Sequence, residues 1–458
     1  MDPKTEQKIF KQTQWPQWLA GIGTNLLLLQ IGMIEMWSSP YYEYLTSPES
    51  DIPVTMDEAS WIVSILLIGD IIGALSSAVI MHYYGTARAV LMMSLTITAS
   101  WFFIAVANEV AWLYAARILA GISMGQAFLY VPFYLSEIAD PTIRGTLVAL
   151  ATNGLSLGNI MMSTMGAYLR MDVSGIICFV ISLVPLIITF WLPNTPHYLI
   201  KIKKEDKARA SILWYHHDCN VESELQALKL FLEKNKCLPF ADVIKEFRNP
   251  CVWKAQVLVS ILVIYYELSQ SYLLYYMETI LEDAQVTVIE PSVMVIAVNV
   301  TGFVGSLVSM FLIDKFGRRI LMIISSLGLT IALICLGVQY QLLDAGYDPT
   351  SFQALPIFAV LLFEMSSFIG IIPVPNAVIS EVYPPHIKYI ASCFTTVVGG
   401  LIAFVAMSIY HPLVNLITEK YVFYAYALIL LTAVPYSYFC MLETRCKSLQ
   451  QIQKEWKS

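Results

Sequence analysis

The chain has 458 residues, of which 57% are hydrophobic and only 13% are charged, and its formal net charge is −7. Soluble domains carry about 25% charged residues, so this composition excludes an ordinary soluble globule. The acidic balance offers no basic surface, and we therefore expect no nucleic-acid partner. The eight cysteines show no metal-ligand spacing, so we expect neither a metal nor a cofactor.

Apolar runs long enough to cross a bilayer recur twelve times along the chain. They span roughly residues 17–38, 58–82, 89–107, 111–135, 146–168, 174–192, 253–276, 291–313, 320–341, 355–380, 389–411 and 421–441. A helix needs about 20 residues to cross a hydrocarbon core of about 30 Å, whereas barrel strands are short and alternate in polarity. The sequence therefore predicts an all-α membrane protein with twelve transmembrane helices in two six-helix pseudo-repeats, embedded in a lipid bilayer.

One charged stretch, from about Pro193 to Pro250, divides six spans from six. We expect a cytoplasmic N-terminal segment (1–16), an N-terminal six-helix half (17–192), a cytoplasmic linker with helices (193–252), a C-terminal six-helix half (253–441) and a cytoplasmic tail (442–458). Transporters built from two such repeats hold their substrate between the repeats, near the bilayer midplane.

The distribution of charge predicts the orientation. Lys and Arg collect in the segments that are cytoplasmic when the N-terminus is inside, above all in the 201–254 stretch, whereas the opposite loops are rich in Asp and Glu. Cytoplasmic loops of membrane proteins retain positive charge. We therefore expect a multi-pass plasma-membrane protein with both termini cytoplasmic.

Loop motifs in both halves combine a carboxylate with basic residues at similar spacing. Their residues are Arg88, Glu137 and Arg144 in the first half, and Asp314, Arg318, Arg319, Glu381 and Lys388 in the second. Paired arginines can fork onto carboxylates at neighbouring helix ends. We therefore expect these residues to act as gating latches.

Several segments resemble motifs of the sugar-porter family of the major facilitator superfamily. They are Arg117–Gly121, Pro132–Gly145, Leu192–Leu199, Asp314–Arg319 and Leu442–Leu449. The resemblance extends from Ser38 to the tail, and the chain looks most similar to the insect trehalose and glucose facilitators. It implies alternating-access transport, in which the loop pairs latch the cytoplasmic side shut while the site faces out.

The sugar-contact positions of that family are largely changed here. The family has a Gln where this chain has Thr152, a Gln-Gln-Leu-Ser-Gly-Ile-Asn run over 265–271 or one residue later, a Trp at Asn376 and an Asn-Trp pair at Gly399 and Gly400. Neither register of the run restores the amides that hold sugar hydroxyls. The candidate substrate-binding residues, at or beside these positions, are Thr152, Asn153, Tyr266, Glu267, Ser271 and Asn376.

Acidic residues lie at membrane depth in four predicted spans: Glu35, Asp70, Glu267 and Glu364. An ionised side chain at mid-bilayer costs at least about 2.5 kcal/mol unless it faces a cavity or a partner. Glu35, Asp70 and Glu364 are therefore possible coupling acids. The alternative is a structural role near the membrane interface.

The first-half loop departs from the family pattern. Where the family has an acid and two arginines, this chain has His82, Thr86 and Ala87, although the turn residue Gly85 remains. We expect Glu137 to pair with Arg88 or Arg144 instead.

The functional prediction is a transporter that moves a small polar solute by facilitated diffusion, with a sugar such as trehalose or a hexose as the first expectation. A proton-coupled or cation-selective carrier that uses the intramembrane acids is one alternative, and a transport-dead membrane sensor of solutes is another. We expect no enzyme, since the sequence contains no nucleophile–base constellation, and no phosphate-binding loop of the form G-x-x-x-x-G-K-[ST] occurs.

Overall fold

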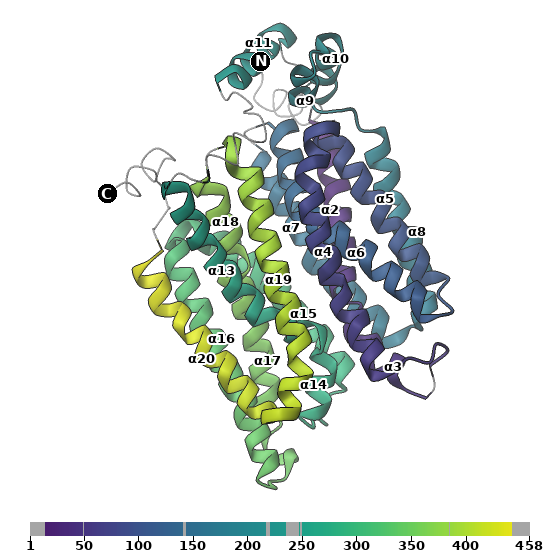
Figure 1. The fold of residues 1–458 in the computed structure, drawn as a ribbon, viewed down its shortest axis with the longest axis vertical. Helices are drawn as coiled ribbons and strands as arrows, with labels where there is room; N and C mark the ends of the chain where they lie inside the picture. The colour runs from purple at the N-terminus through teal and green to yellow at the C-terminus, as the bar shows by residue number, and fades with distance from the viewer. Residues whose placement is uncertain are drawn as a thin grey trace, which may run out of the picture.

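The computed structural model describes residues 14–48, 50–140, 143–216, 220–234, 247, 250–383 and 385–441. Within these ranges every regular element is a helix, and the helices form two bundles that lie side by side (Figure 1). The predicted all-α class is confirmed.

The first bundle consists of α2 (Trp15–Met36), α3 (Ser38–Thr46), α4 (Met56–Tyr84), α5 (Thr86–Ala105), α6 (Val110–Ile138), α7 (Arg144–Tyr168) and α8 (Met171–Trp191). The linker carries α9 (Pro196–Lys201), α10 (Glu205–Tyr215) and α11 (Val221–Lys234). The second bundle consists of α13 (Pro250–Tyr275), α14 (Met277–Asp283), α15 (Pro291–Phe316), α16 (Arg318–Asp344), α17 (Ala354–Ser366), α18 (Pro373–Val382), α19 (Pro385–Ile417) and α20 (Glu419–Phe439), with the short turn η1 (Pro349–Phe352) before α17.

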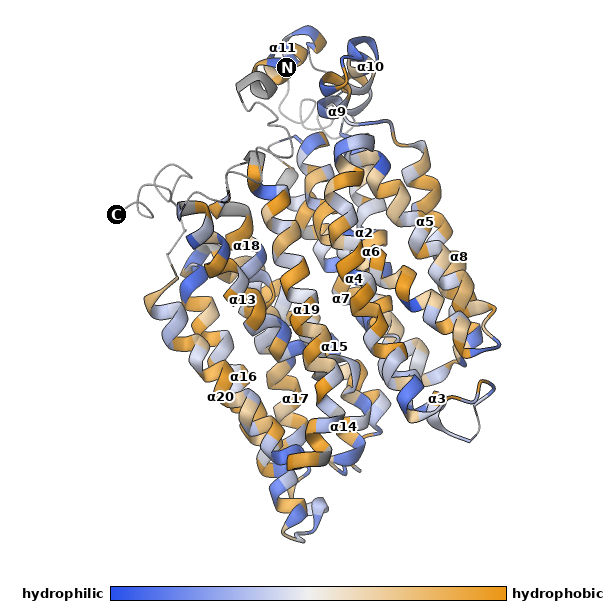
Figure 2. Cartoon of the chain, viewed as in Figure 1, coloured by the Kyte–Doolittle hydropathy of each residue, from blue (hydrophilic) through white to orange (hydrophobic). Residues whose placement is uncertain are grey.

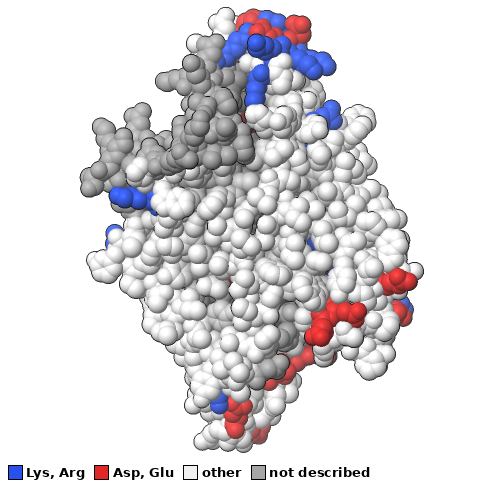
Figure 3. Space-filling view, in the orientation of Figure 1, with Lys and Arg blue, Asp and Glu red and all other residues white. Residues whose placement is uncertain are grey.

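Eleven segments of the described chain are long and apolar enough to cross a membrane, and α2 with α3 counts as one of them. The 25-residue helix α7 is the twelfth, and it packs along α2 and α15. Apolar residues cover the sides of both bundles (Figure 2). Figure 3 shows charged residues gathered at the two ends, with Lys and Arg prominent around α10 and Asp and Glu near α3. The uncharged belt between them is the surface that a bilayer requires.

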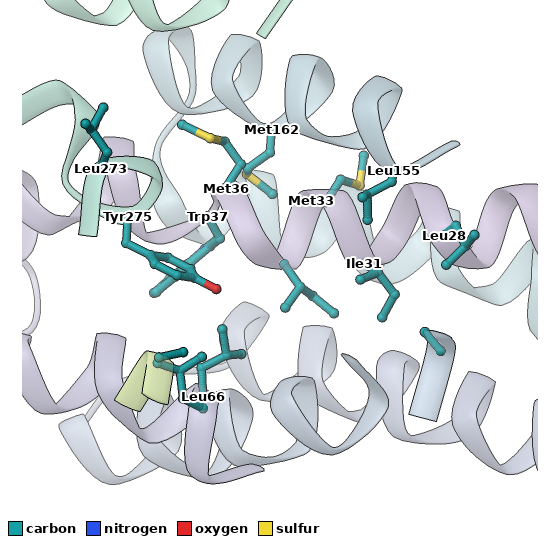
Figure 4. Packing of buried hydrophobic residues seen from close by; sticks show 14 of the residues in the cluster. Leu28, Ile31, Met33, Met36, Trp37, Leu66, Leu155, Met162, Leu273 and Tyr275 are labelled. Carbon is teal, nitrogen blue, oxygen red and sulfur yellow. The ribbon is translucent and has the colours of Figure 1, made fainter. Parts of the chain in front are cut away.

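The two bundles meet along two pairs of helices. Helix α7 packs against α15, and α4 packs against α19. Inside the first bundle, Leu28, Ile31 and Met33 of α2 lie among Leu155 of α7 and other buried apolar side chains (Figure 4).

Two of the described spans are broken rather than continuous. Helices α2 and α3 are divided at Trp37, and α17 and α18 by the π-helical turn η2 (Ser367–Ile371). The tenth apolar run predicts one uninterrupted helix, but Pro373 lacks the N–H group that a regular helix would use there. Such π turns occur frequently at functional sites.

The linker helices dock onto the first bundle through a buried polar cluster. The Gln17 amide donates hydrogen bonds to the Asp140 carboxylate and to the Tyr215 carbonyl, each 3.1 Å long, and His216 Nδ1 lies 2.9 Å from Asp140 Oδ1. The hydrogen bond with His216 is the main reason that the pKa of Asp140 is lowered from its usual value. The Tyr134 and Tyr215 hydroxyls are also hydrogen-bonded, 3.0 Å apart.

Candidate substrate cavity

A central cavity lies between the two bundles, and its empty volume, open solvent included, is about 920 Å³. The first bundle contributes Glu35, Asp70, Met124, Phe128, Leu155 and Asn159 to its wall. The second contributes Val263, Tyr266, Glu267, Gln270, Glu364, Phe368, Ile372, Pro375, Asn376, Ile379, Thr395 and Thr396. Both halves therefore hold whatever occupies the cavity.

Four carboxylates from four different helices converge on this cavity. Glu35 comes from α2, Asp70 from α4, Glu267 from α13 and Glu364 from α17. Glu35, Asp70 and Glu364 are buried, with exposed fractions of 5%, 6% and 1%. The four intramembrane acids that stand apart in the sequence thus share one site.

Two consecutive glycines of α19 make room for two of these carboxylates. A Cβ atom at Gly400 would lie 2.8 Å from Asp70 Oδ2, and one at Gly399 would lie 3.1 Å from Glu267 Oε1. The family pattern has Asn and Trp at these two positions. Their loss clears the space into which the acids project.

The remaining polar groups of the wall are amides and hydroxyls. The Gln270 amide donates a hydrogen bond to the Ser367 hydroxyl, which ties α13 to the π-helical turn. The Asn376 amide donates to the Ile372 carbonyl at 3.3 Å within its own helix turn. Asn159 of α7 faces these residues from the first bundle. These groups can exchange hydrogen bonds with hydroxyls of a solute.

Three of the six candidate substrate-binding residues line the cavity, namely Tyr266, Glu267 and Asn376. Thr152 and Asn153 do not: the Thr152 hydroxyl donates to the Val148 carbonyl at 3.0 Å, and Asn153 accepts a 3.3 Å hydrogen bond from the Ser306 hydroxyl at the α7–α15 contact. The Ser271 side chain lies outside the described residues.

The structure adds residues that the family alignment did not single out. Asn159 follows Thr152 by seven residues, which is two helical turns, and Gln270 follows Glu267 by three. Helical spacing from the candidate positions could therefore have found both. Thr395 and Thr396 come from α19, and nothing in the sequence distinguishes them from other threonines in the spans.

Arg117, the cation in the fourth span, donates hydrogen bonds to backbone carbonyls and does not line the cavity. Arg117 is 1% exposed, and its guanidinium donates hydrogen bonds to the carbonyls of Ile34 and Ile62 at 3.0 and 3.2 Å. It also lies over the Trp37 ring, 5.3 Å from the centroid. Among the described lining residues there is no Lys, Arg or His.

A family model described as "Sugar (and other) transporter" matches residues 29–456. The chain belongs to this transporter family. It is 27% identical to the facilitated trehalose transporter Tret1 of Apis mellifera ligustica over 443 residues, which is 96% of this chain and 88% of that protein. It is 25% identical to Tret1 of Drosophila grimshawi over 99% of this chain, but it spans only 50% of that longer relative.

Solved structures show the same fold at lower identity. A proton:xylose symporter XylE bound to 6-bromo-6-deoxy-D-glucose matches with a TM-score of 0.76 and 18% identity, covering 97% of this chain and all of that one. The inward-open xylose transporter XylE from E. coli matches with a TM-score of 0.77 and 17% identity, covering 96% and 100%. The predicted major facilitator fold is thereby confirmed.

The second-half latch of this transporter is described only in part. The side chains of Asp314 and Glu381 lie outside the described residues. Arg318 donates a 3.2 Å hydrogen bond to the Ile313 carbonyl, and the Arg319 guanidinium lies 4.5 Å from the Tyr438 ring centroid. The loop turns at Gly317, whose φ of 86° favours glycine.

Lys388 of α19 joins the two halves through a contact with α6. Its ammonium group lies 5.8 Å from the centroid of Phe133, which belongs to α6 in the first bundle. The sequence groups Lys388 with Glu381 of its own half. The structure adds a cation–π contact across the halves.

The first-half loop uses hydroxyls where the family has arginine. The Thr86 hydroxyl donates a hydrogen bond to the Glu137 carboxylate and lies 3.3 Å from the Thr195 hydroxyl. Arg88 is exposed, and the Arg144 side chain lies outside the described residues. Glu137 is thus hydrogen-bonded to Thr86, the residue that stands where the family has an arginine.

Aromatic contacts near α3 and α14 also join the two halves. The rings of Tyr42 and Tyr276 meet edge to face at 5.1 Å, and Tyr276 stacks on Tyr410 at 5.7 Å. Beside them, Glu282 of α14 is hydrogen-bonded to Glu43 of α3. The pKa of Glu282 is raised to about 8, first by partial burial and then by this hydrogen bond.

Proposed function

We propose that this chain is an alternating-access carrier that moves a small polyhydroxylated solute, of the sugar class, down its gradient across the plasma membrane. The observation that carries the proposal is the central cavity, because both bundles contribute its wall. A change in the angle between the bundles would open that cavity to one side or the other. The amides, hydroxyls and carboxylates of the wall are suited to a ligand rich in hydroxyl groups.

The contacts at the two ends fit this mechanism. The Tyr42–Tyr276 contact joins the halves on the outer side, and the Lys388–Phe133 contact joins them on the cytoplasmic side. Each contact has to break for the cavity to open on its side. We further propose that both termini are cytoplasmic, and that the five segments expected from the sequence act as two moving halves joined by the linker.

The test is counterflow of radiolabelled D-glucose and trehalose in liposomes that contain the purified full-length protein. Val263→Trp fills the cavity from α13, where Val263 is 8% exposed. We expect this variant to lower exchange by about tenfold or more, equivalent to about 1.4 kcal/mol. Val257→Trp is the matched control, because Val257 lies on the same helix and is 40% exposed.

The expected result is exchange in the wild type and in Val257→Trp, with loss in a Val263→Trp protein that still purifies as a folded monodisperse species. Exchange of neither sugar by the wild type would refute carriage of this solute class. Equal exchange by the two tryptophan variants would show that the solute does not pass through the cavity.

A further inference from the structure

We propose that the central cavity selects a solute carrying both hydroxyl groups and one ammonium group, and that Asp70 and Glu267 form the ammonium site. This inference rests on the proposed function, because it concerns the same cavity. It names a narrower class of substrate, a cationic amino-polyol, of which an amino sugar is the simplest case.

The first observation is that the two carboxylates pack against adjacent glycines of α19. Asp70 Oδ2 lies against Gly400, and Glu267 Oε1 lies against Gly399. Asp70, Glu267 and Gly400 also line one smaller pocket, so the two acids face the same space. Asp70 and Glu267 arrive from opposite bundles, on α4 and α13. A cation between them would bind both halves at once.

The second observation is an unpartnered acceptor in the wall. Glu364 is 1% exposed, and its Oε2 atom has no hydrogen-bond partner in the described structure. A buried acceptor without a donor is destabilising, and more so when it is charged. Glu364 lines the same cavity as Asp70 and Glu267, so a ligand that donates hydrogen bonds there would remove the cost.

The third observation concerns the charge balance. The wall holds four carboxyl groups, and its described residues supply no basic side chain. The buried Arg117 directs its guanidinium to the carbonyls of Ile34 and Ile62. Neutral sugar hydroxyls can donate hydrogen bonds to a carboxyl group, but they bring no positive charge to one that is ionised. An ammonium group supplies three donors and a full positive charge, which is worth more in a cavity of low dielectric than in water.

The spacing of the acids favours a polyatomic cation over a metal ion. In the described chain, no three Asp, Glu, His or Cys residues come close enough to hold one metal ion. The acids instead surround the central cavity together with Asn159, Asn376 and Tyr266. These neutral groups provide partners for hydroxyls while the acids take the ammonium group.

The test compares two probes that differ at one position, D-glucosamine and D-glucose, in liposomes containing the full-length protein at a pH that keeps the amine protonated. We expect the wild type to exchange glucosamine faster than glucose by about tenfold or more, as a charge-assisted contact predicts. Glu267→Gln and Asp70→Asn should each lower the glucosamine-to-glucose ratio by about tenfold. The ratio is measured in the same vesicles, so it does not depend on how much variant protein is folded.

Glu109→Gln is the matched control, because Glu109 is an exposed residue at the outer end of α6 and the change is the same. It should leave the ratio unchanged. A second measurement needs no variant: glucosamine, and not glucose, should raise the unfolding temperature of the purified wild-type protein.

Three results would overturn the inference while leaving the proposed carrier function standing. They are equal exchange of the two probes by the wild type, an unchanged ratio in both acid variants, and glucose uptake driven by an inward proton gradient without preference for glucosamine. The last result would assign the acids to proton binding. Exchange of neither probe, with no exchange of trehalose either, would refute the inference together with the proposed function.

Discussion

The hydroxyl of Thr86, at the start of α5, donates a hydrogen bond to the carboxylate of Glu137, near the end of α6. The loop between α4 and α5 reaches this position by turning at Gly85, whose φ is 80°. Thr86 is 3% exposed and also lies beside Thr195 at the start of α9. One side chain therefore connects the first-half loop, the carboxylate of the latch motif and the linker.

Thr86→Val should destabilise the protein, because valine has nearly the shape of threonine but cannot donate to Glu137. A hydrogen bond to a charged group contributes about 1.5–3 kcal/mol, and we expect a loss in this range. Unfolding of the purified protein in detergent, followed by temperature or denaturant, measures it. Thr86→Ser should recover most of the loss.

Thr98→Val is the comparison for this change. In the described part of the chain, the Thr98 hydroxyl donates to the Ser94 carbonyl of its own helix, at 2.9 Å. If Thr86→Val costs no more than Thr98→Val, the contact with Glu137 does not stabilise the loop.

Glu282→Gln should alter the pH dependence of stability. The pKa of Glu282 is raised to about 8, so the protonated carboxyl donates to Glu43 below that pH. A carboxyl with a raised pKa contributes stability that is present below its ordinary value and is lost as the pH rises toward about 8. Above about 8, two negative charges face each other between α3 and α14. The amide that Glu282→Gln introduces keeps a donor at every pH.

The unfolding temperature, measured from acidic to mildly alkaline pH, should therefore fall less in Glu282→Gln than in the wild type. Glu290→Gln is the matched control, because Glu290 lies eight residues further along the chain, between α14 and α15. Its profile should follow the wild type. Superimposable profiles for all three proteins would mean that the contact with Glu43 has no effect on stability.

Peptide tags test the proposed orientation. A tag inserted after Glu222 in α11 should be reached by antibody only after cells are permeabilised, whereas one beside Asp51 should be reached on intact cells. The reason is the excess of Lys and Arg at one end of the bundles and of Asp and Glu at the other (Figure 3). Labelling of both tags on intact cells would contradict the orientation and with it the assignment of the latches to the cytoplasmic side.

The sequence by itself determined the class of fold. A bilayer leaves no water for backbone groups, so each long apolar run has to be a helix, and the number of runs determines the number of spans. The same argument singled out Glu35, Asp70, Glu267 and Glu364, because an ionisable side chain inside a span is costly unless it faces a cavity or a partner. It did not predict the break at Ser367–Ile371, where prolines and a hydrogen bond from Gln270 outweigh the apolar pattern.

Only the tertiary structure decided which of these residues meet. Asp70 and Glu267 lie far apart in the sequence. They can both pack against α19 because Gly399 and Gly400 have no side chains. Thr152, chosen by alignment, lies outside the cavity wall, since a helix rotates its side chains by about 100° per residue and a small difference in packing turns a position away from the cavity. Helical periodicity defines the faces of a span, but the contacts between spans determine which face meets the solute.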